Sequence, residues 1–421
     1  MTKRNFLQHF TLGGIAVTPF FRKLEDLMLS VEHISPDDLA ANEDFWLKIR
    51  ADYRLKPDYI NLENGYYCIS PQETLENYIH HIREINYQGS WYMRTVQWDN
   101  KDAMAANLAE MLDCPAEEVA ITRNTTESLD TIIGGFPWQA GDEAVYAEQD
   151  YGAMKHMFEQ VAKRFGVVNK VISVPNHPAS DEEIVDLYAK AITPRTRLLM
   201  VCHIINITGH ILPVRKICDM AHSKGVEVLV DGAHSVGHFQ FSMPDLDCDY
   251  YGSSLHKWLS VPLGSGLLYV KKEKISKIWP RFADWGKEDD DIRRLNHTGT
   301  HPVHTDLAVG NALEYYFQLG PERKEKRLRY LQNYWTDQVR DLSHIVLNTP
   351  RERHRSCAIA NVGIKNMPPA ELAETLLKKY RIWTVAIDGA GVHGCRITPN
   401  VFTTTKELDV FVRALREMGK G

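Results

Sequence analysis

Predicted strands and helices alternate between Asp102 and Val270, and this alternation constrains the fold more than any other feature of the chain. Short apolar runs predict strands at residues 119–122, 143–147, 168–174, 198–203, 226–230, 249–252 and 266–270. Helical patterns separate many of them, at residues 126–134, 152–165, 181–192 and 213–224. This order is typical of a mostly parallel sheet with helices on both faces. The sequence therefore predicts an α/β fold whose large domain carries a mostly parallel seven-stranded sheet.

The segments on either side predict two further parts of the chain. Residues 1–58 are expected to form an acidic helical arm, with Ser35 and Pro36 marking a helix start. The large domain would cover residues 59–305, and it would open with a tight turn of positive φ at Asn64-Gly65. A smaller α+β domain would follow at residues 306–421. Its predicted helices lie at 306–319, 322–342, 369–379 and 405–418, and its predicted strands at 356–364, 384–387 and 395–398.

The charge pattern argues against two classes of partner. The chain has 49 Lys and Arg residues against 55 Asp and Glu residues, a net charge of −6, and no basic block. Nucleic acids and anionic membrane surfaces are therefore not expected partners. No apolar run approaches the roughly 20 residues that a bilayer span requires. We expect a small-molecule ligand instead.

The cysteines and the N-terminus bear on location. Seven scattered cysteines without a CxxC pair predict neither a disulfide framework nor a zinc site, so we expect no metal and a reducing, cytoplasmic location. Lys3-Arg4-Asn5-Phe6-Leu7, followed by moderately apolar residues, resembles a twin-arginine export signal, which makes export to the periplasm the alternative. Lys3 in place of the first arginine disfavours export, as does the lack of a small-x-small cleavage site.

Two residues that follow neighbouring predicted strands indicate one cofactor. Asp231 ends an apolar strand, and Lys257 follows the next strand in the segment Ser253-Ser254-Leu255-His256-Lys257. A buried lysine becomes a nucleophile for aldehydes, and a nearby aspartate can pair with a protonated pyridine nitrogen. Together they match the two ends of pyridoxal 5′-phosphate (PLP). Taken alone, Asp231 could equally be a helix cap or a metal ligand.

The Asp-x-Ala-His and Ser-x-His-Lys segments resemble those of the class V aminotransferases of PLP fold type I. This family includes isopenicillin N epimerase and the cysteine desulfurases, and the resemblance covers residues 59–415. It implies a homodimer with shared active sites, in which Thr300 reaches the cofactor phosphate of the neighbouring subunit. It also implies that Arg396 clamps the α-carboxylate of an amino-acid substrate.

The resemblance assigns further cofactor contacts to this chain. They are the phosphate ligands Thr125, Thr126, Ser254 and His256, the stacking residue Tyr151, Asn206 near the phenolic oxygen, and His234. A helix N-terminus after Thr122 is by itself a suitable phosphate seat. Simpler interpretations are a capping box at the threonines, a turn at Asn206 and a core position for Tyr151.

The sequence leaves the reaction open. Desulfuration is disfavoured because the loop at residues 385–394 lacks a cysteine. Transamination, epimerisation and β-elimination all begin with removal of the Cα proton by Lys257, and they differ in where the proton returns and whether a group leaves Cβ. Epimerisation needs a second acid, for which Tyr66, Tyr67, Tyr92 and His393 are candidates.

Two further alternatives remain at this stage. The aromatic run at residues 87–94 could line the substrate entrance, with Arg94 binding an anionic side chain, or it could be a subunit interface.

A protein that keeps PLP without turnover is the rival to an enzyme. An NAD enzyme is excluded, because no GxGxxG segment follows the first strand of the sheet.

Overall fold

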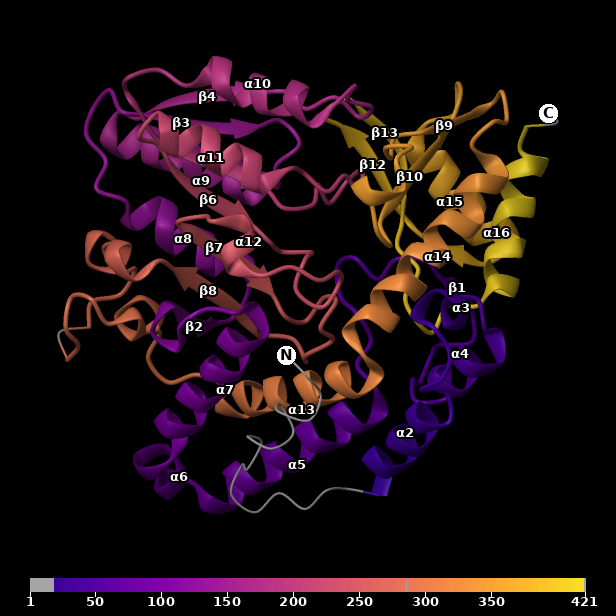
Figure 1. Ribbon diagram of the computed structural model, residues 1–421, viewed down its shortest axis with the longest axis horizontal. Helices are drawn as coiled ribbons and strands as arrows, with labels where there is room; N and C mark the ends of the chain where they lie inside the picture. Colours follow the sequence, from indigo (N-terminus) through magenta and orange to yellow (C-terminus); the bar gives the residue numbers. More distant parts are fainter. Residues whose placement is uncertain (1–18, 285, 420–421) are drawn as a thin grey trace.

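The structure is a computed structural model that describes residues 19–284 and 286–419. Its large lobe contains a seven-stranded sheet in the order β2-β8-β7-β6-β5-β3-β4 (Figure 1). The strands are β2 (Val119–Thr122), β3 (Glu143–Ala147), β4 (Val168–Ile172), β5 (Thr196–Cys202), β6 (Glu227–Asp231), β7 (Tyr250–Ser254) and β8 (Gly266–Val270). β8 runs antiparallel to both neighbours, and the other adjacent pairs are parallel. The predicted mostly parallel seven-stranded sheet is confirmed.

Helices cover both faces of this sheet. The helices of this lobe are α5 (Gln72–Gln88), α6 (Ser90–Thr95), α7 (Gln97–Leu112), α8 (Thr125–Gly135), α9 (Gly152–Phe165), α10 (Asp181–Ala191), α11 (Val214–Ser223), α12 (Met243–Leu246) and α13 (Val303–Leu319). Val228 and Val230 of β6 pack into one core with residues of α7, α10, α11 and α13. Leu229 between them packs into a second core with residues of α8 and α9. Because successive strand residues point to opposite faces, a continuous apolar strand is buried on both sides.

The small lobe holds a four-stranded antiparallel sheet in the order β12-β13-β10-β9. Its strands are β9 (Ile345–Leu347), β10 (Ala360–Ile364), β12 (Val385–Gly389) and β13 (Val392–Ile397), and its helices are α14 (Pro321–Val339), α15 (Pro369–Tyr380) and α16 (Thr405–Glu417). β1 (Ile60–Asn61) pairs in parallel with β11 (Ile382–Trp383), which ties the segment after residue 59 to this lobe. The predicted strand at 356–364 begins only at Ala360, and β9 was not predicted.

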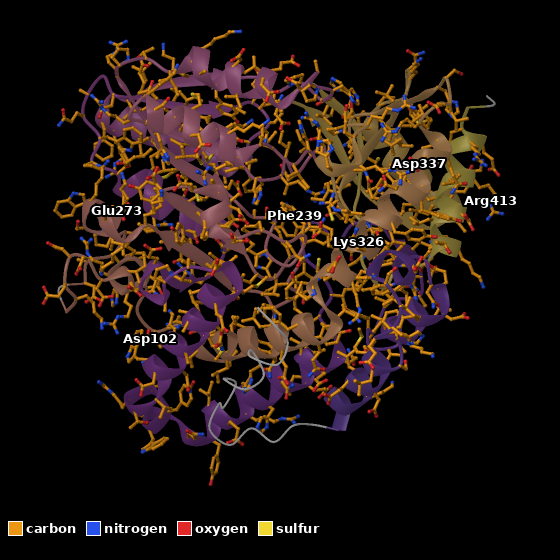
Figure 2. The ribbon with its side chains drawn as sticks, in the orientation of Figure 1. Asp102, Phe239, Glu273, Lys326, Asp337 and Arg413 are labelled. Atoms are coloured by element: carbon orange, nitrogen blue, oxygen red, sulfur yellow. The ribbon has the colours of Figure 1, made fainter. Side chains whose placement is uncertain are left out.

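Among the described residues, three helices precede β1: α2 (Pro19–Leu29), α3 (Pro36–Ala40) and α4 (Glu43–Arg50). They lie along the lower right of Figure 1, where α3 contacts α14 and α2 contacts α13. The predicted helix start is confirmed, since the Asp38 N–H donates to Oγ of Ser35 at 3.1 Å. Trp46 and Phe239 belong to one core with residues of both lobes. Figure 2 labels Phe239 at this junction, far from the peripheral Glu273.

The helix α13 bears on where the lobes divide. Its residues Val309 and Leu313 pack into the core under the seven-stranded sheet, and it lies against α5 and α7. We therefore propose that the lobes divide at Gly320, between α13 and α14, and not at residue 306. Short 3-10 helices are also present in the described residues: η1 (Ala116–Glu118), η2 (Lys272–Lys277), η3 (Ile292–Asn296) and η4 (Arg353–Arg355).

The export alternative depends on Lys3 and Arg4, which lie outside the described residues. Within residues 19–284 and 286–419, no helix combines the length and the apolar character needed to cross a membrane.

Candidate active site

A cavity of about 300 Å³ opens at the carboxyl ends of β5, β6 and β7, where it also meets β13 of the small lobe. Parallel strands in an open α/β sheet present their ligand sites at this edge. The site residues named from the sequence that line it are Thr125, Thr126, Tyr151, Asn206, Asp231, His234, Ser254, His256, Lys257 and Arg396. Thr300 does not line it and is exposed.

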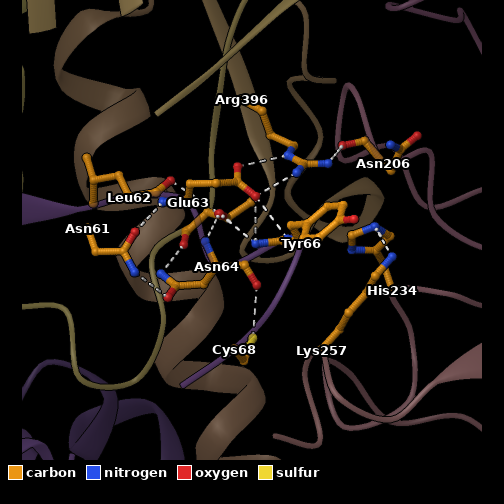
Figure 3. A network of polar contacts seen from close by, with 12 residues as sticks. Asn61, Leu62, Glu63, Asn64, Tyr66, Cys68, Asn206, His234, Lys257 and Arg396 are labelled. Atoms are coloured by element: carbon orange, nitrogen blue, oxygen red, sulfur yellow. Dashed lines mark hydrogen bonds and ion pairs between the residues drawn. The ribbon is translucent and has the colours of Figure 1, made fainter. Parts of the chain in front are cut away.

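Lys257 meets His234 in this cavity (Figure 3). Its Nζ atom lies 2.9 Å from Nε2 of His234, and the indole N–H of Trp258 donates to Nδ1 of the same ring at 3.3 Å. An indole nitrogen can only donate, so Nδ1 accepts and the ring proton sits on Nε2. Nε2–H therefore points at the lysine, which can accept the bond only as an uncharged amine.

Burial favours the same protonation states. It lowers the pKa of His234 well below its ordinary value, so the ring is neutral. Burial also lowers the pKa of Lys257 to about 8, against the opposing charge of Asp231, so the uncharged amine predominates above about that pH. The structure thus holds Lys257 ready to act as a nucleophile or base.

Asp231, the last residue of β6, is 5% exposed. The Ala233 N–H donates to its Oδ1 at 3.0 Å, and among the described residues no salt bridge reaches its carboxylate. Burial raises its pKa, while the Ala233 amide and the charge of Lys257 lower it. A buried carboxylate without a cation is costly, so this position suits a ligand that brings a positive charge.

The N-terminus of α8 lies against the end of β7 and forms an anion seat. The Thr125 N–H donates to Oγ of Ser254 at 3.0 Å, and the two hydroxyl oxygens are 2.7 Å apart. The cap itself is made by Asn124, whose Oδ1 accepts the Glu127 N–H, so neither threonine is used for capping. Nδ1 of His256 is buried and has no hydrogen-bond partner in the described part of the chain. Amides at a helix start, hydroxyls and an imidazole suit a phosphate.

Tyr151 and Asn206 also reach the cavity. Tyr151 precedes α9 and is 47% exposed, which excludes the core position that was the simpler interpretation. Asn206 lies in a turn after β5, and its backbone oxygen accepts a hydrogen bond from Nη1 of Arg396 at 3.4 Å.

Arg396 has a partner that sequence analysis missed. Glu63 receives Nε–H of Arg396 at 3.1 Å and Nη2–H at 2.6 Å (Figure 3). The side chains are 7% and 4% exposed, so this is a buried ion pair. The available signal was a carboxylate next to the Asn64-Gly65 pair, although nothing there pointed to a residue more than 330 positions away.

The expected positive φ at Asn64-Gly65 is wrong, because neither residue has it. This segment instead bonds to the end of β13: the Asn64 N–H donates to Oγ1 of Thr398 at 2.6 Å. Glycine allows a close approach here: a Cβ on Gly65 would lie 3.1 Å from Cζ of Arg396 and 3.2 Å from Cγ2 of Thr398, so these side chains would have to shift slightly.

Of the four candidates for a second acid, Tyr66 alone lines the cavity. Figure 3 places its ring on the side of the network that faces His234 and Lys257. Tyr92 is buried beside Asn100, and His393 bonds Asp388 at 2.6 Å. Arg94 is exposed and does not line the cavity of this chain, so nothing here supports its predicted contact with substrate.

The cavity holds no reactive thiolate. Cys202 is the one cysteine that lines it, and its thiol donates to Asp150 at 3.1 Å. Burial raises the pKa of Cys202 well above its ordinary value. Cys395, next to Arg396, is fully buried, and burial raises its pKa to about 11. In the described residues, no cluster of three or more His, Cys, Asp or Glu side chains could hold a metal ion.

Comparison with known proteins places the chain in a family. The model of the aminotransferase class-V family matches residues 69–414. Isopenicillin N epimerase of Streptomyces clavuligerus is 26% identical over 394 residues, which cover 88% of this chain and 97% of that protein. A probable cysteine desulfurase of Halalkalibacterium halodurans is 25% identical over 319 residues, which cover 72% of this chain and 76% of that protein. Among solved structures, a variant of the cystine C-S lyase C-DES superposes with a TM-score of 0.79 at 19% identity. The match covers 87% of this chain and 98% of that one, which was solved with glycine covalently linked to its PLP cofactor.

The chain therefore belongs to the class V aminotransferase family and has the fold type I architecture of PLP enzymes. PLP is the cofactor of this family, and the cavity fits it. Within the part of the chain that the structure describes, Asp231 has no salt-bridge partner and His256 keeps an unpartnered nitrogen beside the helix start, while Lys257 offers an amine.

Proposed function

We propose that this chain is a PLP-dependent enzyme that acts at Cα of an amino acid or a similar amine, by transamination or epimerisation. The observation that carries the proposal is the Lys257 amine, held by His234 in the same cavity as a buried Asp231. Bound PLP would supply an aldehyde that condenses with amines and a ring that withdraws electrons from Cα.

The residues of the chain have separate tasks in this proposal. Thr125, Thr126, Ser254 and His256 hold the phosphate, Asp231 pairs with the ring nitrogen, and Tyr151, Asn206 and His234 contact the ring. Lys257 anchors the cofactor and takes the Cα proton as general base. Arg396 holds the α-carboxylate. Epimerisation would use Tyr66 to return the proton from the other face.

A C-S lyase or β-lyase is the second candidate, because cysteine desulfurases and the lyase C-DES are among the similar proteins. A desulfurase needs a thiolate beside its substrate, and the cavity offers only the Asp150-bonded Cys202. Elimination without such a thiolate stays compatible with the site.

The proposal extends to a homodimer. Thr300 is exposed and lies outside the cavity of its own chain, as a residue that serves a neighbouring subunit would. The exposed aromatic side chains of Tyr87 and Trp91 are candidates for the subunit contact.

Incubation with a panel of amino acids in heavy water tests the reaction class. Deuterium at Cα with inversion identifies an epimerase, a keto acid identifies an aminotransferase, and pyruvate with released thiol identifies a lyase. No exchange with any member of the panel would contradict the proposal and favour a protein that keeps PLP without turnover.

A further inference from the structure

The guanidinium of Arg396 has a limited set of donors left for a ligand. Of its five N–H groups, Nε–H and one Nη2–H bond Glu63, and one Nη1–H bonds the Asn206 carbonyl. One N–H on Nη1 and one on Nη2 remain. The outer N–H groups of Nη1 and Nη2 share one edge of the planar group, away from Glu63, and form a fork that matches the two oxygens of a carboxylate.

Glu63 is fixed more firmly than a surface partner would be. Its Oε1 accepts the N–H groups of Gly65 at 3.1 Å and Tyr66 at 2.9 Å, in addition to Nη2 of Arg396. The carboxylate thus holds four donors, two of them from the backbone. Glu63 does not line the cavity, whereas Arg396 does, so the carboxylate acts on a ligand only through the arginine.

The charge of Glu63 changes what the fork will bind. A lone Arg396 would attract any carboxylate, but the Glu63–Arg396 pair is neutral. A second carboxylate on the fork would leave the three groups with a net charge of −1 in a nearly dry region, where charges interact strongly. An amino acid offsets this by bringing its own amino group.

We propose that Glu63 is a positioning and specificity residue: it presents only the outer edge of Arg396 to the cavity and makes that edge reject carboxylic acids that lack an amino group. This inference rests on the proposed function, in which Arg396 holds the α-carboxylate. It concerns a residue that neither composition nor spacing had singled out.

Calorimetric titration of the cofactor-loaded protein with propionate tests the inference. Propionate has a carboxylate and no amino group. Glu63→Gln keeps a carbonyl that accepts the backbone N–H groups and removes the charge. We therefore expect propionate to bind to this variant at least about tenfold more tightly than to the unchanged protein. Glu63→Asp keeps the charge, so its affinity for propionate should stay within about threefold of that of the unchanged protein.

Glu407→Gln is the matched control. Glu407 forms a bidentate pair with Arg50 at 2.8 and 2.9 Å and does not line the cavity. Its substitution should leave propionate binding unchanged. Equal affinity of Glu63→Gln and the unchanged protein would overturn the inference, and so would an equal gain in Glu407→Gln or no propionate binding to any variant.

The failure of this inference is distinguishable from that of the proposed function. Cofactor loading is measured first, by the yellow colour of the protein. A protein that takes up no PLP contradicts the proposed function. The order of propionate affinities among the variants can still be measured on the same preparation. A loaded protein in which this order is absent contradicts the role of Glu63 alone.

Discussion

The two halves of the cavity satisfy their polar groups in opposite ways. The half built from the seven-stranded sheet leaves groups open: Asp231 has no ion-pair partner among the described residues, and Nδ1 of His256 has no hydrogen-bond partner there. The half built where β13 meets the segment after β1 is closed on itself, because Arg396 is paired with Glu63. Both halves are buried, so the difference is not one of exposure.

The difference fits two kinds of ligand. A cofactor that stays bound can satisfy the open groups permanently, so they need no partner within the chain. A substrate enters and leaves, and a buried arginine without a partner in the interval would be costly. We therefore expect substitutions in the first half to affect the chemical step, and those in the second half to affect substrate binding.

Substitution of Asp231 should have the largest effect. Asp231→Asn keeps the shape and removes the charge, so turnover should fall by about 10²- to 10⁴-fold while Lys257 still binds the cofactor. Asp150→Asn is the control, because Asp150 is a neighbouring carboxyl that does not line the cavity. It is also buried, and burial raises its pKa to about 7. Unchanged kcat in Asp231→Asn would break the assignment of the first half.

Gly65→Ala should show the opposite pattern. Its new Cβ would press on Cζ of Arg396 and on Thr398, which displaces the fork without touching Lys257. We expect KM to rise by about tenfold, with kcat and cofactor binding nearly unchanged. A fall in kcat with constant KM would mean that the two halves are not separable.

The smallest effect is expected from Trp258→Phe. Phenylalanine keeps the stack on His238, which Trp258 makes with centroids 3.8 Å apart, but it cannot donate to His234. Nε2 of His234 could then accept from a charged lysine, so the pKa of Lys257 should rise above about 8. Reaction of Lys257 with the cofactor aldehyde increases as pH rises through this pKa. The midpoint of this pH profile should therefore move to higher pH in Trp258→Phe. The rate at which Lys257 reacts with the aldehyde near neutral pH should fall by about two- to tenfold. An unmoved midpoint would refute the role of the indole.

The fold was largely predictable because local pattern determines it. β2, β3 and β8 have the predicted bounds, as the apolar runs end at turn residues on both sides. The short strand β9 was missed, since three residues carry little periodicity. The contact of α13 with the large lobe was also not predictable, because a helix with apolar residues around most of its surface does not indicate which neighbour it will meet.

The site was predictable only where residues follow strands. Asp231 is the last residue of β6 and Lys257 follows shortly after the neighbouring β7, so the sheet itself brings them together. Glu63 reaches Arg396 through a parallel bridge between its own backbone and Thr398, more than 330 positions away. Such long-range pairing leaves no periodic trace in the sequence. The donor role of Trp258 likewise depends on a ring orientation that the motif does not contain.

Borohydride reduction of the PLP-loaded protein, followed by peptide mapping, tests the central claim most directly. The account predicts a cofactor adduct on Lys257 and none on Lys324, a buried lysine whose pKa burial also lowers to about 8 but which does not line the cavity. An adduct that persists in Lys257→Ala, or a protein that binds no PLP at all, would contradict it.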